Sequence, residues 1–213
     1  APATPVQVLE VASIERRRTG APLGDDGGWA WPELDVVPAR GGATVAQRDA
    51  LKLLAAMLQH TDSKKEQQRL VCDGPVRRGR CARPFMFIDD VGRTFGRANA
   101  FNRDGPSSVN LAAWSGTPVW ADDTGCRANL GRSMTGTLDH PVVSEEGRQM
   151  LARLLRRLQD RQLRDLFTVA RFPVRASAGG RDEGRDVDGW IEAFKAKATQ
   201  IARRSCTERV ATR

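Results

Sequence analysis

Several features that would assign the chain to a common class are missing from its 213 residues. No apolar run approaches the roughly 18 residues that a membrane-spanning helix needs, so a transmembrane segment is not expected. None of the four cysteines stands in a C-x-x-C pair, which argues against a zinc ribbon. The only histidines are His60 and His140, and no G-x-S-x-G motif accompanies them, which weighs against a Ser-His-Asp hydrolase. There is also no initiator methionine, signal peptide or internal repeat.

Lysine and tyrosine are scarce: the chain has 5 lysines against 29 arginines, and it has no tyrosine. An arginine excess can indicate phosphate recognition, because the guanidinium fork matches phosphate geometry. It can also reflect a GC-rich genome. The arginines are spread along the chain instead of forming one patch, which favours the second explanation.

The net charge of +8 is unevenly distributed. Residues 1–147 hold 18 basic and 18 acidic residues, whereas residues 148–213 hold 16 basic and 8 acidic residues. Within the basic end, arginines recur at roughly helical spacing from Arg153 to Arg164. Nucleic-acid binding is therefore an alternative function, but no nucleic-acid motif is present and aromatic residues do not interleave with the basic ones. A solvated helix face is the preferred interpretation, and a nucleic-acid partner is not expected.

Local patterns predict a mainly α protein with a small β-hairpin. Thr44-x-x-Gln47 is a capping box that opens a helix ending near Gln59–His60. Short β-type runs follow at 69–72 and 84–88. Further expected elements are a strand at Val6–Ile14, a loop-rich segment at 97–143, helices capped by Ser144, by Asp160 and by Asp186 or Asp188, and a linker at 173–186.

Two tryptophans and two cysteines allow predictions about burial and disulfide pairing. Trp29 and Trp31, two positions apart, point the same way in extended chain and are expected to pack on a core. Cys72 and Cys81 flank a short turn, and their spacing suits a local disulfide in an oxidising compartment. Unrelated free or buried thiols are the alternative, and the sequence leaves both open.

One segment carries a recognisable constellation. The predicted helix is followed by His60-Thr61-Asp62-Ser63-Lys64-x-x-Gln67, a strand pair, and then Asp90-Val91-Gly92. This arrangement resembles the catalytic half of the protein-kinase fold, in which an H-x-D-x-K-x-x-N loop follows a long helix and a strand pair delivers an aspartate in a D-x-G turn. The continuation to Phe95-Gly96 is similar to the turn of atypical kinases, including secretory-pathway kinases.

The resemblance implies roles for the residues of the first motif. Phosphoryl transfer depends mainly on positioning and charge neutralisation. Asp62 would accept the proton of an attacking hydroxyl, and Lys64 would neutralise the moving phosphoryl group. His60 would orient the loop.

The same resemblance implies a Mg²⁺ site and the cofactors ATP and Mg²⁺. Gln67 and Asp90 would bind the metal through oxygen, with Asp89 as a neighbour able to substitute for Asp90. Gly92 would give the backbone the freedom to turn. The substrate would be an unidentified hydroxyl compound.

The chain departs from the family pattern at three points. Gln67 replaces the usual asparagine, and the 28-residue separation between Asp62 and Asp90 is longer than usual. No G-x-G-x-x-G and no V-A-I-K-type lysine precede the helix, and about 43 residues are too few for a nucleotide-covering lobe. The chain is therefore expected to be a kinase-like helical C-lobe that lacks most of the N-lobe, inactive by itself, with the missing lobe or an upstream domain as its partner.

The expected organisation is a hinge or N-terminal extension at 1–43 and a kinase-like lobe at 44–213. The lobe divides into a catalytic-loop and D-x-G region at 44–96, a loop-rich segment at 97–143 and a basic helical subdomain at 144–213. A pseudokinase or interaction module without catalysis is the main alternative function. The cysteine spacing and the secretory-kinase-like turn point towards an exported protein.

Overall fold

In the computed structural model of the chain, the structure describes residues 20–23, 28–91, 94–96, 109–123, 125–177 and 184–206. The expected strand Val6–Ile14 lies outside these residues. The α-helices are α1 (Val45–Leu58), α2 (Leu111–Gly116), α3 (Glu145–Leu155), α4 (Asp160–Val169), α5 (Phe172–Ser177) and α6 (Val187–Arg203). The strands are β1 (Ala21–Pro22), β2 (Gln68–Cys72), β3 (Val76–Arg77), β4 (Arg80–Cys81) and β5 (Pro84–Ile88), and the 3-10 helices are η1 (Trp31–Val36), η2 (Pro38–Arg40) and η3 (Lys65–Gln67).

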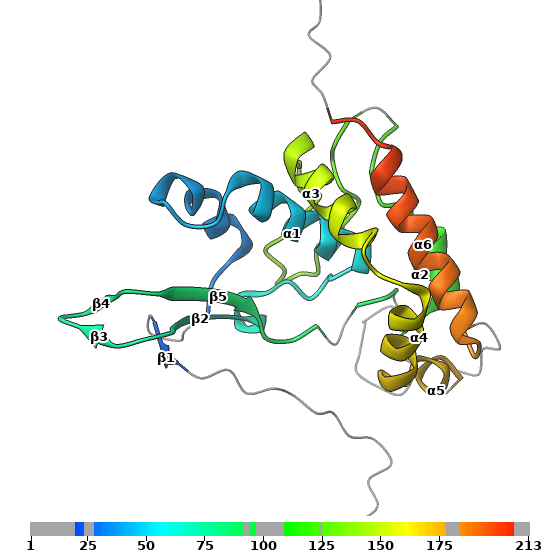
Figure 1. Cartoon of the computed structure of the whole chain (residues 1–213), viewed down its shortest axis with the longest axis horizontal. Helices are drawn as coiled ribbons and strands as arrows, with labels where there is room; N and C mark the ends of the chain where they lie inside the picture. The colour runs from blue at the N-terminus through cyan, green and yellow to red at the C-terminus, as the bar shows by residue number, and fades with distance from the viewer. Residues whose placement is uncertain are drawn as a thin grey trace, which may run out of the picture.

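These elements confirm a mainly α architecture with a small antiparallel sheet (Figure 1). The larger sheet has the order β1-β2-β5, and β3 and β4 form a second, two-stranded sheet. Among the described residues, no helix combines the length and apolar character needed to cross a membrane.

Helix α1 begins and ends as the sequence predicts. The Gln47 backbone N–H donates to Thr44 Oγ1 at 3.3 Å, and the Gln47 side-chain oxygen accepts from the Thr44 backbone N–H at 2.8 Å. At the other end, Gln59 adopts a left-handed conformation with φ 60°, which stops the helix. The chain therefore leaves α1 at a defined angle into the segment that begins with His60.

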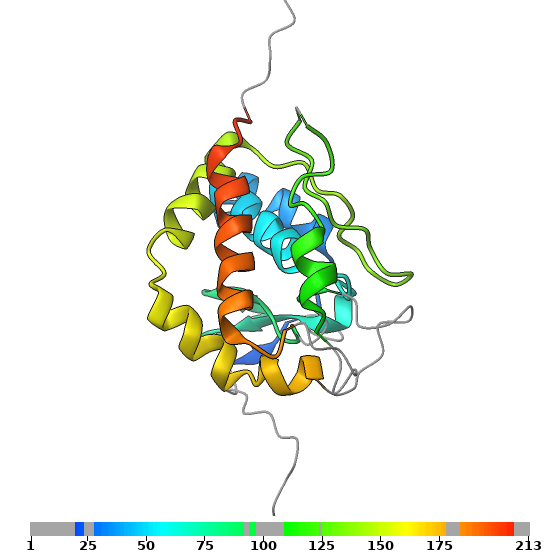
Figure 2. The same cartoon turned by 90° about the vertical axis from the view of Figure 1, so that its right-hand side faces the viewer.

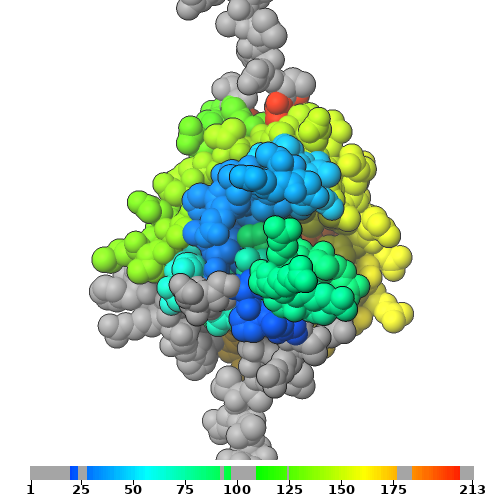
Figure 3. Space-filling model, turned by 90° about the vertical axis from the view of Figure 1, so that its left-hand side faces the viewer, coloured from blue at the N-terminus to red at the C-terminus, as the bar shows by residue number. Residues whose placement is uncertain are grey.

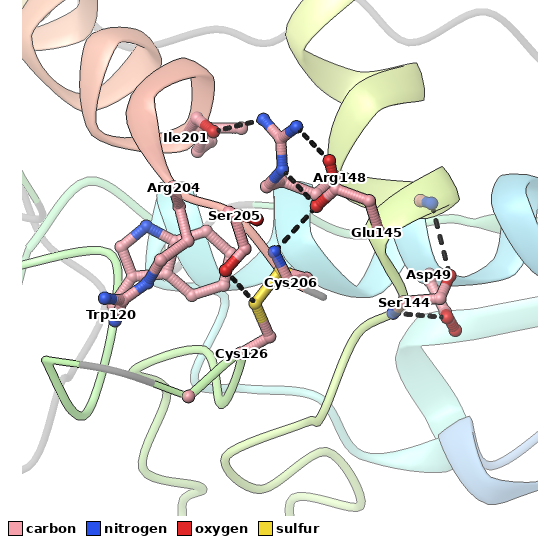
Figure 4. The surroundings of a disulfide bond; sticks show 12 residues. Asp49, Trp120, Cys126, Ser144, Glu145, Arg148, Ile201, Arg204, Ser205 and Cys206 are labelled. Carbon is pink, nitrogen blue, oxygen red and sulfur yellow. Dashed lines mark hydrogen bonds and ion pairs between the residues drawn. A yellow bond between two sulfur atoms is a disulfide. The ribbon is translucent and has the colours of Figure 1, made fainter. Parts of the chain in front are cut away.

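Helices α1 and α3 pack closely because a glycine lies at their contact. A Cβ atom placed on Gly147 would come within 2.4 Å of the Asp49 Cβ atom. The buried Asp49 carboxylate also accepts a hydrogen bond from the backbone N–H of Ser144 at 2.9 Å (Figure 4). Ser144 is the N-cap of α3, as its sequence predicts, and Asp49 thus fixes the start of α3 against α1.

A cluster of aromatic rings joins the remaining helices. Figure 2 shows α6 crossing the molecule, with α2 beside it and α4 and α5 at its lower end. The Trp114 and Trp190 rings stack at 5.8 Å, and the Phe172 ring meets the Trp190 ring edge-on at 4.7 Å. Phe95 contacts the same rings, so the segment after the sheet is anchored in the helical core.

The two N-terminal tryptophans lie in the core, as predicted. Trp29 is 1% exposed and Trp31 is fully buried, and the two rings meet edge-on at 5.4 Å. Trp29 donates its indole N–H to the Arg69 carbonyl at 3.0 Å, which ties this segment to β2.

Both pairs of cysteines form disulfides. The Cys72–Cys81 bond closes the turn beyond β2, as one of the two sequence interpretations anticipates. The Cys126–Cys206 bond joins residues 80 positions apart, which the sequence did not indicate. Figure 4 shows its surroundings: Glu145 accepts from the Cys206 backbone N–H and from the guanidinium of Arg148.

Three helices differ from the sequence predictions. Helix α2 lies inside the segment 97–143 that was expected to be loop-rich, and Asn110 caps it by accepting from the Ala113 backbone N–H. Helix α5 occupies the start of the expected linker at 173–186. Its Pro173 falls in the first turn, where proline is tolerated, and Phe172 and Ala176 are buried against the aromatic core. Helix α4 is capped by Gln159 instead of Asp160, whose carboxylate pairs with Lys195 Nζ at 3.0 Å.

Candidate functional site

The candidate site starts where α1 ends. The backbone N–H of His60 donates to the Ala55 carbonyl at 2.9 Å, and the chain then continues through a loop to η3. This loop is buried although it is polar: Asp62 is 6% exposed and Ser63 is fully buried. Buried polar chain needs hydrogen-bond partners, so the loop's position must be specified by its neighbours.

A distant segment supplies those partners. The Ser133 backbone N–H donates to the Thr61 carbonyl at 3.2 Å, and the Thr137 backbone N–H donates to the Ser63 carbonyl at 3.0 Å. The Thr137 hydroxyl donates to the same Ser63 carbonyl at 2.8 Å and accepts from the Trp31 backbone N–H at 3.1 Å. The sequence analysis missed these residues, because nothing in a loop-rich segment about 70 positions away indicates the contact.

Three of the predicted site residues meet in this loop. Gln67 Nε2 donates a hydrogen bond to Asp62 Oδ2 at 3.0 Å. Lys64 Nζ lies 4.0 Å from Asp62 Oδ1. The carboxylate therefore has an amide donor on one oxygen and an ammonium group near the other, which leaves the Gln67 side-chain oxygen available to face a cation.

The strand pair brings Asp90 to the same place. The backbone N–H groups of Asp89 and Asp90 donate to the Gln67 carbonyl at 2.8 and 3.3 Å. The Asp89 carboxylate turns to Arg69, with Oδ2 3.3 Å from Nε, so it is engaged away from Gln67. Of the two candidate carboxylates, Asp90 is the one whose charge acts on His60. Gly92 lies outside the described residues.

His60 is buried beside these carboxylates. The imidazole is 3% exposed, and within the described part of the chain neither ring nitrogen has a hydrogen-bond partner. Burial lowers the pKa of His60 below its usual value, while the nearby charges of Asp62 and Asp90 act in the opposite direction. The imidazole is therefore neutral at neutral pH, and its ring centre lies 6.1 Å from that of Trp31.

Gln67 and Asp90 carry oxygen donors of the type that Mg²⁺ prefers. Among the described residues, no group of three or more His, Cys, Asp or Glu side chains is arranged to hold a metal ion. Mg²⁺ does not need such a cage, since it binds through one or two carboxylates together with substrate phosphates and water. One amide oxygen from Gln67 and one carboxylate from Asp90 form an all-oxygen set of this kind.

Two hollows of the surface lie away from this loop. One of about 1210 Å³ opens beside the Cys126–Cys206 disulfide, and one of about 310 Å³ lies between η1 and residues 137–142. Neither includes a residue of the loop 60–67.

The structure thus brings together Asp62, Lys64, Gln67 and the backbone of Asp90, with His60 buried behind them. Comparison of the chain with protein-family models, with curated proteins and with solved structures gave no match. Function is accordingly inferred from the residues of the site and their arrangement.

Proposed function

We propose that the chain is the C-terminal lobe of a kinase-like phosphotransferase, which transfers a phosphoryl group from ATP to a hydroxyl when a nucleotide-binding part is supplied. One observation carries the proposal. At the end of a capped helix, Asp62 is hydrogen-bonded to Gln67, lies close to Lys64, and sits where the strand pair delivers Asp90.

The chain's own residues have distinct tasks in this reaction. Asp62 accepts the proton of the attacking hydroxyl, and the hydrogen bond from Gln67 holds its carboxylate in one orientation. Lys64 places a positive charge 4.0 Å from that carboxylate, where it can stabilise the negative charge of the phosphoryl group. The bonds from Thr137 to Ser63 keep the loop from shifting as the substrate binds.

Gln67 and Asp90 would hold Mg²⁺ through their side-chain oxygens. When bound, the ion supplies charge neutralisation across the nucleotide phosphates. The hydrogen bond from the Asp90 backbone N–H to the Gln67 carbonyl holds the two backbones together before any ligand arrives.

The nucleotide-binding part is a required partner in this proposal. The sequence has no G-x-G-x-x-G ahead of residue 60. Neither of the two hollows described above includes a residue of the loop. We expect little or no turnover from the chain alone.

The test is ATP turnover and Mg²⁺-dependent nucleotide binding, measured on the chain and on a version extended upstream of Ala1. In the extended protein, Asp62→Asn should lower kcat by about 100-fold or more, as expected for loss of a general base, with ATP affinity unchanged. Asp90→Asn should weaken Mg²⁺-dependent ATP binding.

Asp89→Asn is the matched control. It removes the same charge one position away from Asp90, at a carboxylate that is paired with Arg69. It should leave both turnover and nucleotide binding unchanged. A folded, extended protein that binds no Mg·ATP would refute the proposal, and so would equal losses from the Asp89 and Asp90 substitutions.

A second candidate, an interaction module that keeps this fold without catalysis, is favoured by the burial of Asp62. A carboxylate that is 6% exposed and hydrogen-bonded to Gln67 is poorly accessible to a substrate hydroxyl. Nucleotide binding with no turnover, insensitive to Asp62→Asn, would support this candidate over the first.

A further inference from the structure

The hairpin beyond β2 and β5 forms an arm that projects from the body of the protein (Figure 1). It continues the strand pair past Cys72 and Pro84 and ends in the two-residue strands β3 and β4. Figure 3 looks onto the end of the arm, which faces the viewer in green at the centre of the molecule. All residues from Pro75 to Arg80 are exposed, so the arm contributes nothing to the core.

Three arginines occupy the tip of the arm. Arg77 and Arg80 are cross-strand partners, and Arg78 and Gly79 form the turn between them. Among the described residues, none of these three guanidinium groups has a hydrogen-bond or ion-pair partner. The tip therefore presents three unneutralised positive charges to solvent.

This arrangement opposes the stability of the hairpin in two ways. Like charges directly opposite each other on a strand pair are destabilising, and Arg77 faces Arg80. Arg78 has φ 51° and Gly79 has φ 72°, the pattern of a type I′ turn, in which asparagine is preferred at the first position. A strained arginine between two repelling arginines is unfavourable for folding, and such unfavourable features tend to occur at functional positions.

A disulfide holds the tip together despite this repulsion. Cys81 follows Arg80 directly and is bonded to Cys72 at the base of the arm. The bond constrains a segment that buries almost nothing, so its main effect is to keep the three arginines close together. A rigid cluster of guanidinium groups binds a multiply charged anion with a smaller loss of conformational freedom than three mobile side chains.

The position of the tip favours a macromolecule as the occupant. Ten residues of nearly extended chain separate Gln68 from Arg78, which places the tip up to roughly 30 Å from the candidate site. A small substrate held at the tip could not reach Asp62. The tip also lies apart from both hollows of the surface.

The composition and the open edges of the tip indicate which macromolecule. Residues 75–80 include no aromatic side chain to stack on bases, as single-stranded nucleic acid would need. Val76 is an exposed apolar side chain in this stretch, but the tip has no Trp, Phe or Leu of the kind that anchors a segment in a bilayer. Within the described residues, no third strand pairs with β3 or β4, so backbone groups at the edges remain open. Only a polypeptide can use these edges for strand addition while its carboxylates pair with the arginines.

We propose that the arm is a docking element for an acidic, extended segment of a partner protein, with Arg77, Arg78 and Arg80 as the charge-recognising residues. The acidic side chains would alternate along the segment, because alternate residues of a strand face the same side. This binding function is separate from the chemistry proposed for Asp62 and can be present or absent independently of it.

The test uses a fluorescein-labelled ten-residue peptide of alternating Glu and Thr, with binding followed by fluorescence anisotropy. The arm variant is Arg77→Thr/Arg78→Asn/Arg80→Thr, which replaces the charges by residues that suit a hairpin strand and a type I′ turn. The matched control is Arg153→Gln/Arg156→Gln/Arg157→Gln, which removes the same charge from exposed arginines at the end of α3.

The arm variant should bind the peptide about ten-fold more weakly, since three individually weak pairs act together, and the control should change affinity by less than about two-fold. The melting temperature of the arm variant should be unchanged or higher. An equal loss in the control, a lower melting temperature of the arm variant, or no binding of the peptide to the unaltered protein would overturn the proposal. The proposal would also be overturned if the arm substitutions weakened binding to a ten-nucleotide single-stranded DNA, or to vesicles containing phosphatidylglycerol, more than they weakened binding to the peptide.

Discussion

Lys197 allows a test of whether the helical core excludes water from a buried ammonium group. This residue of α6 is 1% exposed, and its ammonium group donates to the Thr117 carbonyl at 2.6 Å and lies 5.2 Å from the centre of the Trp114 ring. No carboxylate neutralises it in the described interactions. Burial lowers the pKa of Lys197 from 10.5 to about 8.

The lowered pKa fixes both the sign and the size of a pH effect. Below pH 8 the amine is charged in both states, and the folded protein bears the full cost of burying the charge. Between pH 8 and 10.5 the unfolded chain binds the proton and the folded protein does not, so the free energy of unfolding rises with pH. At about 1.4 kcal/mol per pH unit, the rise is roughly 3 kcal/mol across this window.

The comparison is with Lys197→Met, which keeps the length of the side chain and removes the charge. Urea denaturation at pH 7, 8, 9 and 10 should show the unaltered protein gaining roughly 2–3 kcal/mol relative to the variant between the two ends. Because the described cysteines are all in disulfides, free thiols do not complicate the alkaline measurements. Parallel stability curves for the two proteins would refute the reasoning, since they would mean that water reaches the ammonium group in the folded state.

Two further predictions concern the junction of α1, α3 and α6. Gly147→Ala places a Cβ atom 2.4 Å from the Asp49 Cβ atom and should lower the free energy of unfolding by about 1–3 kcal/mol, measured by urea denaturation; an unchanged value would show that the two helices separate at no cost. Arg148 holds the pKa of Glu145 at about 2 against its usual 4.5. The ionised Glu145 carboxylate therefore contributes roughly 2 kcal/mol to the free energy of unfolding above pH 4.5, and this contribution is lost as the pH falls towards 2. Glu145→Gln should remove that dependence in acid denaturation followed by circular dichroism, and an acid transition identical to that of the unaltered protein would contradict the assignment.

The helical part of the fold could be predicted because its signals are local. Thr44 and Ser144 cap helices through side chains that bond within three residues of themselves. The order of α1, the following loop and the strand pair β2–β5 was also predictable from the sequence. Such features depend on chain neighbours, which the sequence displays directly.

The features that the sequence could not supply depend on contacts between distant residues. Four cysteines allow three pairings, and nothing near Cys126 indicates Cys206. The start of the predicted linker at 173–186 folds as a helix because Phe172 and Ala176 reach an aromatic core built by other segments. Helix propensity alone did not predict it.

The candidate site likewise has a part that the sequence predicted and a part that depends on contacts between distant residues. The spacing of Asp62, Lys64 and Gln67 predicted that they would meet, and the structure brings them together. The bonds from Thr137 to Ser63 were invisible in the sequence, because a threonine in a polar loop has no periodic pattern to mark it. The motif therefore predicted which residues would lie near one another, and their chemical roles stay predictions. Long-range contacts decide how firmly the loop is held.

The two disulfides differ in when they can form during synthesis. Cys72 and Cys81 are 9 positions apart and can meet as soon as that stretch of chain has entered an oxidising compartment. Cys126 must wait for residue 206, which follows α6, the last helix described. Under oxidising conditions the second bond is therefore the later of the two to form during synthesis, and a chain that ends before residue 206 carries an unpaired thiol at Cys126.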